Sequence, residues 1–75
     1  MQLGRVKWFN EIKGTGVIRG SHGNEYPVDF DKILDDGFRT LFEGETVEFD
    51  VISSSRGDIA VNVRRSMNSV QEGDS

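Results

Sequence analysis

Cysteine is absent from this chain of 75 residues, and proline, histidine and tryptophan each occur once. Without thiols the protein has neither disulfide bonds nor thiolate metal ligands, which excludes the class of small secreted domains stapled by disulfides. Long apolar stretches are also missing, and the first residues lack the apolar region of a signal peptide. We therefore expect a soluble, cytoplasmic protein that does not interact with membranes.

The groups that enzymes need are scarce. His22, the single imidazole, falls in a predicted turn, and no pair of carboxylates is accompanied by a plausible base and an oxyanion site. The acidic residues between positions 29 and 36 lack the glycine and the terminal glutamate of a calcium loop. The sequence predicts no catalysis, no cofactor, no metal site and no small-molecule substrate.

The hydrophobic pattern is that of an all-β chain. Apolar and polar residues alternate with period two between glycine-rich clusters, and no segment keeps helical periodicity over three turns. Strands are predicted at residues 3–10, 15–19, 25–30, 46–52 and 59–65. A flat sheet of five short strands would leave exposed edges, so the pattern favours a closed antiparallel barrel.

The length allows one domain with a single small core. We assign residues 1–66 to this domain and expect the connection 31–45 to cover one end of the barrel. The polar tail 67–75 has too little apolar area to offset the entropy of ordering it, so we predict that it is disordered. The predicted core consists of Val6, Ile18, Val28, Ile33, Val47, Val51 and Val63.

Charge is distributed unevenly along the chain. The net charge of −4 comes from 9 basic and 13 acidic residues, with +2 over residues 1–28 and −6 over residues 29–50. The overall sign disfavours a protein that coats nucleic acid by charge alone. A polyanion would be confined to the basic first third, although an ordinary solvated surface explains the same distribution.

Several short motifs stand out along the chain. They are GRVKWFN at residues 4–10, KGTGVI at 13–18, VDF at 28–30, GFRTL at 37–41 and RGDIAVNV at 56–63. Together, and without a gap over residues 1–66, they resemble the bacterial cold-shock proteins. The resemblance implies an OB-fold, a five-stranded antiparallel barrel with Greek-key connections, which stacks aromatic rings on the bases of single-stranded RNA or DNA.

Four positions depart from the family pattern. Where family members typically read Lys-Gly-Phe-Gly-Phe-Ile and Val-Phe-Val-His-Phe, this chain replaces the rings by Thr15, Val17, Pro27 and Asp29. Strand alternation places all four on the face that the resemblance makes solvent-facing. Each aromatic stack contributes about 1–3 kcal/mol, and Asp29 would repel a phosphate, so we expect weakened binding.

The resemblance also implies a set of nucleic-acid-binding residues. It consists of Lys7, Trp8, Phe9, Lys13, Phe30, Phe38 and Arg56. Trp8 is the better stacking candidate, because one of two adjacent strand residues must point inward and Phe9 is as well suited to the core. In a regular strand the side chain of Phe30 would point into the core. It is available to a ligand only if its strand is bulged or ends there. Phe38 could instead pack within its loop, and the basic residues could simply be solubilising charges.

Two functions are consistent with these features. The first is a cold-shock-like protein that binds single-stranded RNA or DNA weakly and acts passively, as a chaperone or in the regulation of gene expression such as transcription. The second is a protein-binding regulatory module in which Trp8, Val17 and Pro27 form an apolar patch. Because Pro27 has no N–H, we also predict that its strand is an edge, bulged or unpaired at that point.

Overall fold

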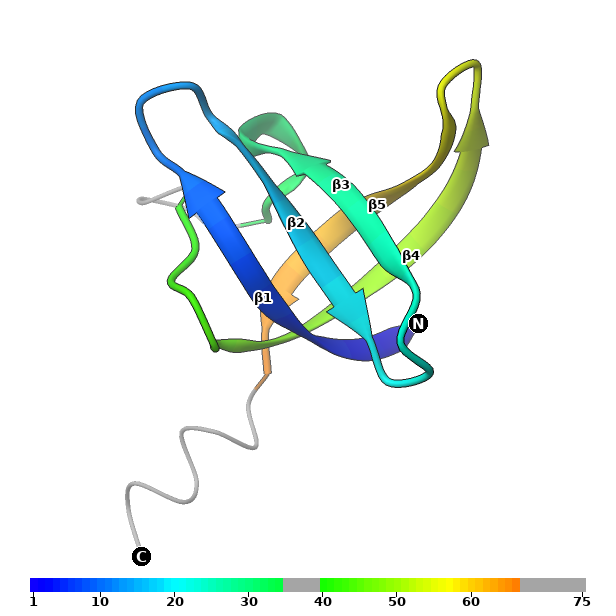
Figure 1. Ribbon diagram of the computed structural model, residues 1–75, viewed down its shortest axis with the longest axis horizontal. Helices are drawn as coiled ribbons and strands as arrows, with labels where there is room; N and C mark the ends of the chain where they lie inside the picture. The colour runs from blue at the N-terminus through cyan, green and yellow to red at the C-terminus, as the bar shows by residue number, and fades with distance from the viewer. Residues whose placement is uncertain (35–39, 67–75) are drawn as a thin grey trace, which may run out of the picture.

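The computed structural model describes residues 1–34 and 40–66, in which five antiparallel strands form one sheet (Figure 1). The elements are β1 (Gln2–Asn10), β2 (Thr15–Gly20), β3 (Glu25–Asp29), the 3-10 helix η1 (Phe30–Lys32), β4 (Thr46–Ser54) and β5 (Gly57–Arg65). The all-β prediction is confirmed, and every strand boundary lies within two residues of its predicted position. Within the described residues, no helix has the length and apolar character needed to cross a membrane.

The sheet is strongly curled. Its strand order is β3-β2-β1-β4-β5, and β4 and β5 cross behind the half formed by β1, β2 and β3 (Figure 1). The segment after η1 joins the two ends of the sheet, because Ile33 forms a parallel bridge with Val63 and the Leu34 N–H donates to the Val63 carbonyl at 2.7 Å. The two halves therefore enclose a common interior, and one face of each is left to solvent.

The interior contains the predicted aliphatic residues and one large ring. Six of the seven predicted core residues are fully buried, and Val51 is partly buried against them. Phe49, Leu41 and Ala60 join this core without having been predicted. The ring of Tyr26 packs on that of Phe49 with centroids 5.6 Å apart, so an aromatic pair fills the space where the halves of the sheet meet.

Strand β3 is an edge of the hydrogen-bonded sheet, as the proline predicts. The Phe30 N–H donates to the Gly14 carbonyl and the Gly20 N–H to the Asn24 carbonyl, both at 2.8 Å. Since hydrogen-bonded pairs alternate along an antiparallel ladder, Pro27 is in a non-hydrogen-bonded pair and its nitrogen points away from β2. The missing N–H costs no ladder bond, and a proline on this edge blocks the addition of another strand.

The start of β4 and the end of β5 are tied to the loop that precedes β4. The guanidinium of Arg65 donates to the carboxylate of Glu45 and, at 2.8 Å, to the Thr40 carbonyl. Thr40 and Leu41, in the described part of the connection 31–45, are buried. The predicted disordered tail 67–75 lies outside the described residues.

Candidate functional site

The outer face of β1, β2 and β3 carries several of the residues singled out from the sequence. Cross-strand register aligns the outward-facing residues of these strands in rows: Arg5, Arg19 and Glu25; then Trp8, Val17 and Pro27; then Asn10, Thr15 and Asp29. The intervening residues Gly16, Ile18 and Val28 are buried. The four positions that depart from the family pattern thus lie together on the solvent side of one three-stranded surface, which we call the outer face.

A bulge in β1 decides which of the two adjacent rings reaches this face. Val6 pairs with Ile18 and Trp8 with Val17, so Lys7 is an extra residue in β1. Lys7 is exposed and Trp8 remains 44% exposed, whereas the ring of Phe9 packs against the core. Trp8 is therefore available for stacking, and Phe9 mainly supports the fold.

Gly16 makes room for this arrangement. A Cβ atom at Gly16 would lie 2.4 Å from the Trp8 carbonyl oxygen and 2.6 Å from Cδ1 of Phe9. Neither distance is compatible with ordinary van der Waals contact. The glycine in the KGTGVI motif consequently allows β1 to cross β2 closely enough to seat one ring inside and expose the other.

Phe30 belongs to the surface because β3 ends one residue before it. It begins η1, which takes its side chain out of the strand alternation, and it remains 50% exposed. Its ring lies over Gly14, where a Cβ atom would be 2.8 Å from the ring and where φ is +70°. The strand therefore ends before Phe30, which is the case in which its side chain was expected to be exposed, and Phe30 is open to a ligand.

Two of the predicted basic residues lie on hairpin turns. The turn that contains Lys13 is held by Asn10, whose side-chain oxygen accepts from the Ile12 and Lys13 N–H groups at 3.0 Å. Ile12, at the tip of this turn, is 94% exposed and was not anticipated. In the β4–β5 turn, the Ser54 hydroxyl accepts from the Arg56 N–H at 3.1 Å. Both turns therefore present a cation to solvent.

Arg56 is brought next to β3 by the curl of the sheet. It lines a small groove of about 130 Å³ together with Thr15, Pro27, Asp29, Lys32, Ile59 and Ala60. The groove joins the β4–β5 hairpin to the outer face, so Arg56 extends that face beyond its edge strand. Phe38, the remaining predicted residue, lies outside the described residues.

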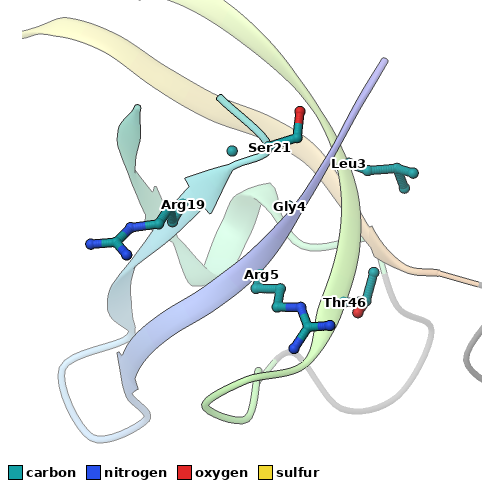
Figure 2. Close-up of a pocket in the computed structure, with 7 residues that line it drawn as sticks. Leu3, Gly4, Arg5, Arg19, Ser21 and Thr46 are labelled. Atoms are coloured by element: carbon teal, nitrogen blue, oxygen red, sulfur yellow. The ribbon is translucent and has the colours of Figure 1, made fainter. Parts of the chain in front are cut away.

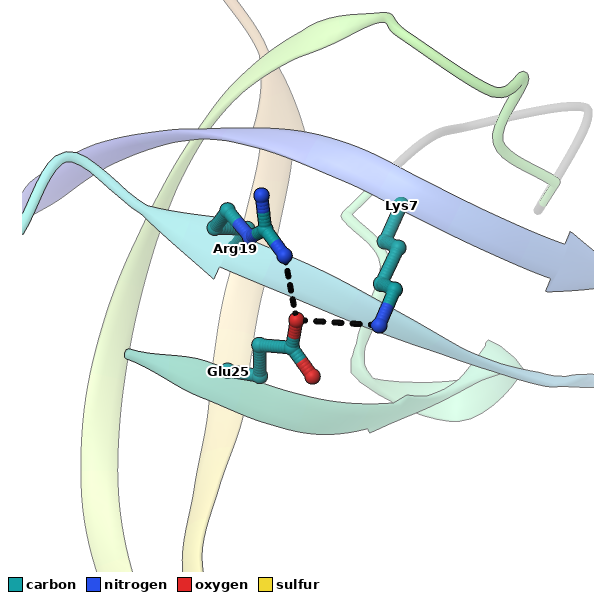
Figure 3. A network of polar contacts seen from close by, with 3 residues as sticks. All are labelled: Lys7, Arg19 and Glu25. Atoms are coloured by element: carbon teal, nitrogen blue, oxygen red, sulfur yellow. Dashed lines mark hydrogen bonds and ion pairs between the residues drawn. The ribbon is translucent and has the colours of Figure 1, made fainter. Parts of the chain in front are cut away.

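A network of charges on the outer face joins Lys7, Arg19 and Glu25 (Figure 3). One oxygen of Glu25 accepts from Lys7 Nζ at 3.0 Å and from Arg19 Nη2 at 2.9 Å. These two donors lower the pKa of the Glu25 carboxyl from its ordinary value of 4.5, with Arg19 the larger cause. Arg19 and Glu25 were not predicted as site residues, because only the cross-strand register brings them to Lys7.

The outer face continues into a pocket at the start of β1 (Figure 2). The pocket measures about 330 Å³ and is lined by Leu3, Gly4, Arg5, Arg19, Gly20, Ser21 and Thr46. A Cβ atom at Gly4 would lie 2.5 Å from the Arg19 carbonyl oxygen, so glycine permits the close crossing of β1 and β2 here. The result is a basic end of the outer face. No cluster of three or more potential metal ligands occurs in the parts of the chain described.

Comparison with known proteins identifies the family. The family model of the "Cold-shock" DNA-binding domain matches residues 2–66. Cold shock protein 1 of Lactiplantibacillus plantarum is 54% identical over 63 residues, which are 84% of this chain and 96% of that protein. The cold shock-like protein CspD of Bacillus cereus and the cold shock protein CspC of Bacillus subtilis are each 46% identical over 65 residues, which are 87% of this chain and 98% of either relative.

These matches agree with the structure. The family is described by DNA binding and not by a reaction, in accordance with the prediction that the chain is not an enzyme. The match covers all five strands and the outer face. The chain belongs to the cold-shock domain family.

Proposed function

We propose that this protein binds single-stranded RNA or DNA on its outer face, in the cytoplasm, with an affinity reduced by the changes at positions 15, 17, 27 and 29. Trp8 and Phe30 would stack on unpaired bases, while Lys7, Lys13 and Arg56 contact phosphates. Such binding keeps strands unpaired without chemistry, which is the action of a nucleic-acid chaperone or of a regulator of gene expression.

The observation that carries this proposal is the exposure of Trp8 and Phe30 beside cations. Large aromatic side chains are normally buried, yet these two are about half exposed. Lys7 precedes Trp8 on the same surface, and the turn residue Lys13 is next to Gly14, over which the Phe30 ring lies. Rings flanked by cations match the chemistry of unpaired bases joined by phosphates.

The reduced affinity follows from what stands between the two rings. Val17 pairs with Trp8, and Thr15 pairs with Asp29, so that aliphatic, hydroxyl and carboxylate groups occupy the middle of the outer face. None of these groups provides the stacking energy of about 1–3 kcal/mol per base that an aromatic ring contributes. Asp29 also places a negative charge beside the groove that Arg56 lines.

A fluorescence titration tests the proposal. Trp8 is the single tryptophan of the chain, so quenching on addition of a pyrimidine oligonucleotide of about six to eight bases reports stacking directly. We expect saturable quenching at low salt that weakens as salt is raised. An unchanged Trp8 signal at low salt and high micromolar oligonucleotide would exclude this function.

A second candidate is a protein-binding regulatory module. It is favoured by the direct alignment of Trp8, Val17 and Pro27 in one row, which forms an apolar strip across three strands. A pull-down from nuclease-treated lysate distinguishes the two candidates. A stoichiometric protein partner that is lost in a Val17→Asp variant supports the module, and recovery of nuclease-sensitive material alone supports the first candidate.

A further inference from the structure

Lys7 and Arg19 converge on a single point of the outer face. Their side chains come from two different strands, and both donate to the same oxygen of Glu25, at 3.0 and 2.9 Å (Figure 3). Proteins hold a phosphate oxygen in the same way, with two charged donors directed at one anionic oxygen. The carboxylate therefore marks a position that is already built for an anion.

Positive charge exceeds negative charge around this position. Arg5 lies directly opposite Arg19 in the β1–β2 register, and like charges in that relation destabilise a sheet. Arg5 makes no ion pair with any residue that the structure describes. It lines the pocket of Figure 2 and an adjoining pocket of about 310 Å³, and Arg19 lines both as well. Glu43 also lines the second of these pockets. Two carboxylates, Glu25 and Glu43, therefore lie among three cations, and positive charge is still in excess.

We propose that Lys7 and Arg19 form a phosphate-binding site for single-stranded nucleic acid, and that Glu25 occupies this site in the free protein as an internal competitor. The inference rests on the function proposed above. An arriving phosphate takes the place of the carboxylate, which turns to solvent. Arg5 then faces a second phosphate of the same strand, and the Trp8 ring lies next to this path.

The competitor is charged under physiological conditions. Because Arg19 and Lys7 lower the pKa of Glu25, its carboxyl stays ionised at neutral pH and below. Its side chain is 36% exposed and does not belong to the core, so the core stays intact when the carboxylate leaves the two cations. The ion pairs of Glu25 with Lys7 and Arg19 therefore lower the affinity for phosphate without blocking access to the site.

The variant Glu25→Gln tests this inference, with Glu48→Gln as a control that removes the same charge. Glu48 is on β4, opposite Leu3 and Arg64 in the register and away from Lys7. Titrations of a pyrimidine oligonucleotide against Trp8 fluorescence should give Glu25→Gln an affinity roughly 2- to 10-fold above wild type. Its salt dependence should steepen by about 0.7 in log K against log salt for each additional phosphate that the protein neutralises. Glu48→Gln should stay near wild type.

The higher affinity must depend on the two cations. In a Lys7→Gln, Arg19→Gln background, replacing Glu25 by Gln should change affinity no more than the Glu48→Gln control does. Equal increases from Glu25→Gln and Glu48→Gln, or an increase that survives removal of both cations, would overturn the inference while leaving the proposed function intact. Absence of binding by wild type and every variant would instead overturn the proposed function and, with it, this inference.

Discussion

Trp8 and Phe9 are neighbours in the sequence, but the bulge at Lys7 gives them opposite environments. One ring is exposed on the outer face, and the other packs against the core across from Gly16. Phe30 is exposed as well, because η1 begins there. The aromatic residues predicted from the family pattern therefore divide into rings that can meet a base and a ring that maintains the fold.

This division predicts different consequences for two alanine variants. Phe30→Ala should leave the free energy of unfolding nearly unchanged and should weaken oligonucleotide binding roughly 5- to 10-fold, as expected for the loss of one stack. Phe9→Ala should lower the free energy of unfolding by about 1–3 kcal/mol, because its ring is partly buried. Chemical denaturation and Trp8 fluorescence titration measure the two effects. The reverse pattern would show that the two rings had been assigned the wrong roles.

Two carboxylates give the stability of the fold a dependence on pH. The pKa of Glu25 is lowered by Arg19 and Lys7, and that of Asp50 is lowered chiefly by a hydrogen bond from Asn62, with the N-terminal ammonium contributing. A carboxyl with a lowered pKa in the folded state contributes stability above its unfolded pKa and loses it as pH falls through the folded value.

We therefore expect unfolding midpoints to be constant from pH 7 to about 5 and to fall below the ordinary values of 4.5 for Glu25 and 3.8 for Asp50. Both groups are at the surface, so the effect of each is small. In a Glu25→Gln, Asp50→Asn double variant the decline in this range should be shallower than in wild type. Thermal unfolding followed by circular dichroism at several pH values measures the decline. If the unfolding midpoint depended on pH identically in both proteins, the lowered pKa values of Glu25 and Asp50 would not be the cause of the decline.

At the level of elements, a second bulge shapes the β4–β5 ribbon. The register shifts between Glu48 and Asp50, and Asn62 on β5 adopts a φ of +53°. Asparagine tolerates this left-handed conformation better than most residues do, and its side chain donates to Asp50 at 3.1 Å. The bulge strengthens the twist that carries β4 and β5 behind the outer face.

The backbone at Asn62 can be tested by two substitutions. Asn62→Gly and Asn62→Ala both remove the hydrogen bond to Asp50, so the difference between them isolates the cost of the positive φ. We expect the alanine variant to be less stable than the glycine variant by about 1 kcal/mol in urea denaturation. An alanine variant as stable as the glycine variant would mean that residue 62 does not hold this conformation in solution.

The strands could be predicted because their signal is local. Period-two alternation and glycine-rich turns determine which side chains point inward, and a slip of one residue would expose the core set that includes Ile18 and Val28. The bulge at Lys7 and the end of β3 before Phe30 were not predictable, since both depend on how strands pair. For the same reason the sequence placed Lys7 in the site but missed Arg19 and Glu25, whose contacts cross three strands.

Arg56 illustrates the same limit for the interface as a whole. Its turn is evident from the residues around it, but its position in the groove beside Pro27 and Asp29 depends on the curl that brings the β4–β5 hairpin next to β3. Family resemblance supplied Arg56 as a candidate where local pattern could not. The structure adds the neighbours that determine its electrostatic surroundings.

At the level of the whole molecule, the outer face departs from the family pattern while the core does not. The predicted core is retained, while the middle of the outer face lacks aromatic rings. Restoring one ring should therefore raise affinity without rebuilding the fold. Val17→Phe, opposite Trp8 in the register, is expected to strengthen pyrimidine binding roughly 10-fold.

The control for this variant is Val17→Leu, which enlarges the side chain at the same position without adding a ring. Isothermal titration calorimetry with the same oligonucleotide compares the two variants with wild type. Equal affinities for the leucine and phenylalanine variants would indicate that added apolar area, and not stacking, limits binding.

The most direct test of the central claim is a map of backbone amide shifts in ¹⁵N-labelled protein during titration with a pyrimidine oligonucleotide. Binding on the outer face predicts the largest changes in β1 from Lys7 to Asn10, in β2, in β3 up to Phe30 and around Arg56. Glu48 on β4, which the register places opposite Leu3 and Arg64, should move little. Saturating changes confined to β4, or no changes at any oligonucleotide concentration, would contradict the account.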